Sequence, residues 1–193
     1  MTSSAYRLLT LMAAYVGLDP GKDIEWITNE NIGTIKLFMD GKIDAFLGFP
    51  PETQLVLAHK IGHSILNTTV DSPWSHYYCC LLGGTTDFVT KYPIATKRVV
   101  RAFLKAVDIC RTQPALAART VVDRGVTDQY DYTLEGLTEA RYDRWRDFHP
   151  EDTLRFYALR MREVGFIKST PQQVIANGTD WRFLNELKRE LKT

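Results

Sequence analysis

Hydrophobic and polar positions at the start of the chain follow a helical period. This period predicts a helix over residues 3–17, with Ser3 and Ser4 as good N-cap residues and Gly17 as its C-cap. A charged residue followed by an apolar stretch also begins a leader peptide, but no convincing cleavage site follows here. We therefore expect a helix of the fold, with no export signal in this chain.

Short apolar runs between the helical stretches predict β-strands. Further helices are predicted over residues 32–39, which Asn29 or Asn31 can cap, and over residues 52–61. The predicted strands cover residues 24–27, 45–49, 65–68 and 74–82. The run 45–49 is apolar throughout, which is typical of a strand buried on both faces. Helices that alternate with such strands predict parallel βαβ units.

The rest of the chain is predicted to be helical. Its predicted helices cover residues 93–112, 114–122, 133–140, 150–164, 170–176 and 180–191. The predicted fold class is therefore α/β, with a parallel βαβ lobe over residues 1–73 and a return strand plus a mainly helical part over residues 74–193. A parallel sheet needs central strands, and the second part supplies at most one. Its helices either form their own bundle or belong on a sheet whose other strands are missing.

Composition indicates a soluble globular protein, because 45% of its 193 residues are hydrophobic and 24% are charged. The net charge of +1 provides no global field for nucleic acid or anionic lipid, and no segment has the length to span a bilayer. The three cysteines, Cys79, Cys80 and Cys110, give no disulfide framework. On a strand, Cys79 and Cys80 would point to opposite faces, which disfavours a disulfide between them.

The turn after the apolar run 45–49 is one candidate binding site, because open α/β sheets bind ligands at the carboxyl ends of their strands. Phe49 can stack on a flat or apolar ligand, Pro50 shapes the turn, and Glu52 can accept a hydrogen bond from a cation or hydroxyl. Alternatively, the proline pair simply starts a helix and Glu52 favours its positive end. A carboxylate that faces the ligand argues against a bare anion.

The other candidate binding and metal sites have weaker support in the sequence. The hydroxyls and free backbone N–H groups of Ser3 and Ser4 suit an anion such as sulfonate or nitrate, or serve as an ordinary N-cap. Trp74 and His76 suit closure around a ligand, although core packing explains aromatic residues here nearly as well. The spacing of four between His59 and His63 does not predict a metal site, because a glycine intervenes and no third ligand follows. No Ser/His/Asp or Cys/His set can be assembled.

Several segments together resemble a known family, the periplasmic solute-binding proteins of ABC importers. They are the runs Ser3 to Leu9, Val16 to Trp26, Asp40 to Ala45, Lys97 to Cys110 and Asp180 to Leu187. The group that these segments resemble is the nitrate/sulfonate/taurine and thiamine-precursor (NMT1-like) type, and the resemblance covers nearly the whole chain. It implies a type II periplasmic-binding-protein fold, a periplasmic location, a permease partner and a non-catalytic role without a cofactor.

The resemblance also implies where particular segments of the chain lie in a two-lobed fold. The start of the first helix, with Ser3, Ser4 and Tyr6, should lie in an interlobe cleft, and the segment from Trp74 should return from the second lobe to the first. Members of this family are longer, so we expect this chain to lack an N-terminal portion and to build only half of the cleft. Weak binding and exposed apolar surface, relieved by self-association, are then expected.

Two other functions remain open from the sequence. An enzyme of the same fold that makes a thiamine pyrimidine precursor would need a cysteine-rich motif and a cofactor lysine, and Cys79 with Cys80 is a thin match for that motif. An effector-binding module of a transcription regulator would need a DNA-binding helix-turn-helix on another chain.

Overall fold

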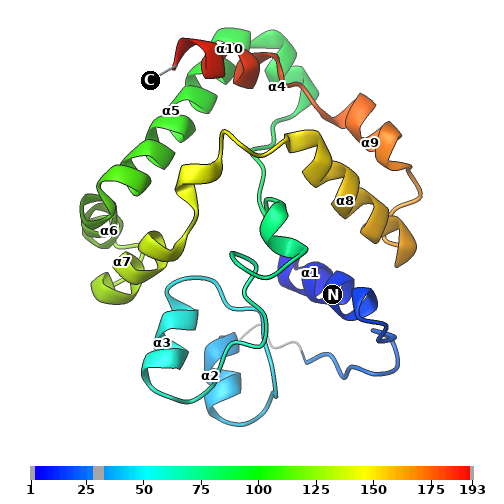
Figure 1. Cartoon of the computed structure of the whole chain (residues 1–193), viewed down its shortest axis with the longest axis vertical. Coiled ribbons are helices and arrows are strands. Elements are labelled where there is room, and N and C mark those ends of the chain that lie inside the picture. Colours follow the sequence, from blue (N-terminus) through cyan, green and yellow to red (C-terminus); the bar gives the residue numbers. More distant parts are fainter. Residues whose placement is uncertain (1–2, 28–32, 192–193) are drawn as a thin grey trace.

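The computed structural model describes residues 3–27 and 33–191, and Figure 1 shows their arrangement. Within these residues the secondary structure consists of ten α-helices and two short 3-10 helices. In chain order they are α1 (Ser4–Tyr15), α2 (Thr34–Met39), α3 (Glu52–Ala58), η1 (Trp74–His76), α4 (Thr86–Lys91), α5 (Pro93–Thr112), α6 (Pro114–Asp123), α7 (Tyr130–Glu139), η2 (Tyr142–Arg144), α8 (Pro150–Glu163), α9 (Pro171–Gly178) and α10 (Arg182–Glu190).

The predicted α/β class with a parallel βαβ lobe is wrong, because the described residues contain no β-strand. Residues 24–27, 45–49 and 65–68 form irregular connections, and the predicted strand over residues 74–82 begins instead with the 3-10 helix η1. An apolar run favours an extended or buried segment, but a strand exists only through backbone pairing with a neighbour. That pairing is a tertiary event, which the hydrophobic pattern of one segment does not encode.

Most predicted helices are confirmed, since their signals lie in adjacent residues. The Ser3 side chain accepts a hydrogen bond from the Tyr6 amide at 3.1 Å, and Gly17 ends α1 with a φ of 87° that favours glycine. The helices α5, α6 and α8 each begin at the predicted proline. Helix α4 was not predicted, although Thr85 caps it. The suggested caps Asn29 and Asn31 lie outside the described residues.

The longest helix, α5, runs along one side of the molecule, and other helices pack against it (Figure 1). The helices α4 and α10 pack against α5 near one end, and α6 and α7 pack near the other. The helices α8 and α9 pack together on the opposite side, and α1 packs against α8. The 3-10 helix η2 packs against α5, so the aromatic and charged segment of residues 142–149 begins with a helical turn held against α5. A contact between α3 and α7 joins the early part of the chain to the later part.

Buried apolar side chains are few and dispersed. Leu187 on α10 is 0% exposed and Leu11 on α1 is 1% exposed, whereas Phe103 on α5 is 55% exposed. The chain exposes 13137 Å² of surface, whereas a compact monomer of 22.1 kDa exposes about 9,300 Å². The excess is well above the roughly 800 Å² that each partner buries in a standard interface. This open packing leaves many large apolar side chains in water, with Ile65 81% and Val126 75% exposed, and such surface favours association.

Candidate functional site

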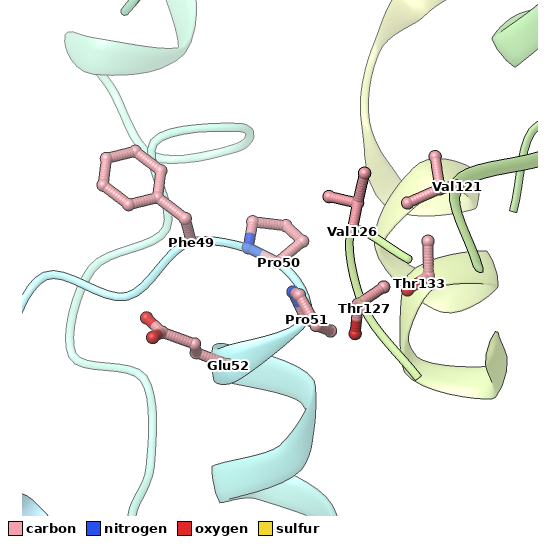
Figure 2. A pocket seen from close by; sticks show the side chains of 8 residues that line it. All are labelled: Phe49, Pro50, Pro51, Glu52, Val121, Val126, Thr127 and Thr133. Carbon is pink, nitrogen blue, oxygen red and sulfur yellow. The ribbon is translucent and has the colours of Figure 1, made fainter. Parts of the chain in front are cut away.

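The turn from Phe49 to Glu52 lines a pocket with a volume of about 380 Å³. Its far wall comes from the corner between α6 and α7, about seventy residues later in the chain. The lining residues, drawn in Figure 2, are Phe49, Pro50, Pro51, Glu52, Val121, Val126, Thr127 and Thr133. This volume lies near the lower end of the range typical of small-molecule sites.

Local sequence explains the shape of the near wall of the pocket, which is the turn from Phe49 to Glu52. The Glu52 amide donates a hydrogen bond to the Phe49 carbonyl at 2.8 Å, which closes the turn and leads into α3. Pro51 stands just before the helix, where the amide that proline lacks has no helical partner to lose. A Cβ at Gly48 would lie 2.7 Å from the Thr53 side chain, so only glycine lets the turn fold back this closely.

The far wall is a helix–helix corner. After α6 the chain reverses at Gly125, whose φ is 68°, and the Val126 amide donates to the Val121 carbonyl at 3.2 Å. This reversal leaves Val126 75% exposed at the rim of the pocket. The Thr133 hydroxyl donates to the Gln129 carbonyl at 2.6 Å, so it supports the start of α7 and is engaged within the wall.

Two contacts hold the walls together. Gln54 of α3 is 4% exposed, and its Nε2 donates to Oε2 of Glu139 in α7 at 3.0 Å. Gly136 of α7 lies so close to Pro50 that an added Cβ would meet the proline Cβ at 2.7 Å. Because a proline ring cannot rotate away, the absence of a side chain at Gly136 allows the two walls to approach.

The pocket combines apolar surface with a few polar groups. Figure 2 shows Pro50 and Pro51 facing Val126 and Thr127, while the Phe49 ring and the Glu52 carboxylate lie on the other side of the turn. Aromatic and aliphatic surface suits a flat or apolar moiety. The carboxylate attracts a cation or accepts from a hydrogen-bond donor, and it repels a bare oxyanion.

The predicted anion site at the start of α1 lies elsewhere. Ser3 and Ser4 are exposed and are not among the residues that line this pocket. The Tyr6 ring packs edge-on against Trp26 with the ring centroids 4.7 Å apart. The structure therefore does not bring these three predicted residues together with Phe49, Pro50 and Glu52.

Trp74 is a packing residue in this structure. It is 2% exposed, and its ring lies 5.6 Å from that of Tyr15 in α1 and 5.4 Å from that of Phe156 in α8. Trp74 thereby packs η1 between these two helices. Aromatic pairs at such edge-to-face angles are energetically favourable. His76 is exposed beside Tyr77, and neither Trp74 nor His76 lines the pocket.

Other features of the described residues add little chemistry. A second pocket of about 240 Å³ lies between the start of α8 and α10, and its charges are mixed, with Arg146 and Lys188 beside Asp147 and Glu151. Residues 3–27 and 33–191 contain no group of three or more His, Cys, Asp or Glu side chains placed to hold a metal ion. In the same residues no helix is both long and apolar enough to cross a membrane.

Sequence reasoning found one wall of the pocket and missed the other. Val121, Val126 and Thr127 carry no motif, and nothing local links them to the turn at Phe49. The available signal was Gly125 between two amphipathic helices, which indicates a tight corner but not what packs against it.

Comparison with known proteins identifies the class. Residues 2–123 match the NMT1-like family, which is more than half of the chain. The chain belongs to the NMT1-like family, and the resemblance to NMT1-like solute-binding proteins is thus confirmed. The matched residues include α1 and the Phe49–Glu52 turn and end with α6. The same comparisons found no match among curated proteins and none among solved structures.

Proposed function

We propose that this chain is the solute-binding component of an ABC-type importer and binds a small organic molecule at the Phe49–Glu52 turn, on the side where the Phe49 ring and the Glu52 carboxylate lie. Membership of the NMT1-like family supports the general role. The observation that carries the site is that Phe49, Pro50 and Glu52, all expected to bind ligand from the sequence, line one pocket.

The lining chemistry favours a neutral or cationic ligand with a flat or apolar part. Phe49 is 46% exposed, and its ring lies on the same side of the turn as the Glu52 carboxylate. An amino-substituted heteroaromatic ring meets both requirements, because it stacks and donates hydrogen bonds. A nitrate or a sulfonate group meets neither. The pocket is open to solvent, so the expected affinity is weaker than micromolar.

The role is non-catalytic in this proposal, and the partner is a membrane permease that accepts the solute on the periplasmic side. Binding proteins of this kind deliver solute by closing around it and releasing it at the permease. No cofactor is part of the proposal.

Isothermal titration calorimetry with an aminopyrimidine, an aliphatic amine, a sulfonate and nitrate tests the proposed ligand class. We expect heat of binding with the aminopyrimidine, reduced at least tenfold in affinity by Glu52→Gln. The matched control is Glu135→Gln, which removes the same charge from an exposed position on α7 outside the pocket. Preference for sulfonate or nitrate, or equal effects of the two variants, would contradict the proposed site.

A further inference from the structure

The adjacent residues Cys79 and Cys80 place their sulfur atoms side by side. The sequence predicts opposite faces of a strand for these side chains, and this expectation is wrong. The chain bends at Cys79 and forms no strand there, so the two Sγ atoms lie 3.3 Å apart. Both residues are exposed and both are free thiols, so a reagent in solution can reach them.

The segment before the pair is anchored to its surroundings. The Tyr77 ring stacks on Phe156 of α8 with centroids 4.1 Å apart and an interplanar angle of 11°. The Tyr78 hydroxyl donates to the Trp145 carbonyl at 2.7 Å. These contacts fix the chain that leads into Cys79, and the bend at Cys79 then brings the two sulfurs together. Figure 1 shows this stretch running from η1 toward α4, as the link between two groups of helices.

We propose that Cys79 and Cys80 are a reversible oxidation site that forms an intramolecular disulfide. The oxidant is a low-molecular-weight disulfide such as oxidised glutathione. One cysteine thiolate attacks it, giving a mixed disulfide and releasing one small thiol. The neighbouring thiolate then attacks the protein sulfur of that mixed disulfide, forming the Cys79–Cys80 bond and releasing the second small thiol. Two protein thiols are thereby oxidised and one small disulfide is reduced to two thiols.

Geometry favours closure and also makes the bond easy to reopen. The sulfurs need to approach by about 1.2 Å to reach bonding distance. Adjacent residues have Cα atoms about 3.8 Å apart, which is shorter than in ordinary disulfides, and strained, exposed disulfides are the labile ones. Desolvation and the contact with Cys80 raise the pKa of Cys79 to about 11, so only a small fraction of Cys79 is the reactive thiolate at neutral pH, and the exchange should become faster as the pH rises. Tyr157 of α8 also faces the pair, and burial raises its pKa to about 12.

Thiol counting with mass spectrometry tests the proposal. The reduced chain is incubated in glutathione buffers of increasing oxidised fraction, and the remaining thiols are alkylated in denaturant and mapped by peptide. We expect two of the three thiols to disappear together at low protein concentration, with the loss mapped to the peptide that holds Cys79 and Cys80. Cys110→Ser should leave this reaction unchanged, and reduced glutathione should reverse it.

Variants and an unfolded control separate the alternatives. In Cys79→Ser and in Cys80→Ser the remaining thiol of the pair should acquire a glutathione adduct and no internal disulfide. The ratio of internal disulfide to glutathione adduct should be higher in the native chain than in denaturant, because the fold holds the sulfurs together. Three intact thiols, a bond to Cys110, a bond between chains, or equal ratios in native and unfolded chains would each overturn the proposal.

Discussion

Gly136→Ala perturbs the contact between the two pocket walls. Gly136 is buried in α7, and the new Cβ would lie 2.7 Å from the Pro50 Cβ and 3.5 Å from the Gln54 Nε2. Carbon atoms pack at about 3.5–4.0 Å, so the α3–α7 contact must open by roughly 1 Å. The proline ring has no rotamer that avoids the contact, and the strain therefore falls on the backbone of the turn.

Two opposing effects set the change in the free energy of unfolding that Gly136→Ala causes. Alanine in place of glycine in a helix stabilises by up to about 1 kcal/mol, and overpacking a close contact costs about 1–3 kcal/mol. Gly178→Ala is the matched control, because it makes the same change in α9 where no atom lies within 4 Å of the added Cβ. We expect Gly136→Ala to have a free energy of unfolding about 1–3 kcal/mol below that of Gly178→Ala.

Urea unfolding followed by circular dichroism measures this difference. With a urea dependence of about 1–3 kcal/mol per molar, the midpoint of Gly136→Ala should lie roughly 1 M below that of the control. Gly136→Ala should also weaken aminopyrimidine binding, since it displaces the turn that carries Phe49 and Glu52. Coincident urea midpoints would refute the close approach of α3 and α7, and unchanged binding would refute the location of the ligand.

Four further outcomes are expected. Leu187→Ala should lower the free energy of unfolding by about 2–5 kcal/mol in denaturant melts, because Leu187 is 0% exposed and leaves a cavity; a change below 1 kcal/mol would refute that packing. The chain should self-associate in sedimentation velocity, and Phe103→Asp on the exposed face of α5 should shift it toward monomer, whereas a monomeric parent would exclude such an interface. Thr170→Ala removes the capping box of α9 and should cost about 1 kcal/mol by thermal melting, against no change if the cap is absent. Desolvation raises the pKa of Tyr78 and Tyr157 to about 12 and also raises the pKa of Tyr142, so in a near-ultraviolet titration these phenols should ionise later than free tyrosine. Since unfolded tyrosine ionises near pH 10, the stability of the fold should be unaffected by these groups below about pH 10 and should fall as the pH rises toward 12.

Helix positions could be predicted from the sequence because their signals are local. Ser3 caps α1, Gly17 ends it, and prolines begin α5 and α6, all by contacts within a few residues. The cysteine pair shows the limit of this reasoning. Its side chains were assigned to opposite faces on the assumption of a strand, and the bend at Cys79 reverses that conclusion.

The sequence alone was enough to predict most of the helices, the turn at Phe49–Glu52 and the family resemblance that comparison confirmed over residues 2–123. Tertiary packing, in contrast, leaves the apolar runs without strand partners, places Trp74 between α1 and α8, and brings the turn to the α6–α7 corner. The physical reason is the range of the interactions. Caps and helical periods act over a few residues, whereas strand pairing and pocket walls depend on which distant segments meet, and their partners are not marked in the local pattern.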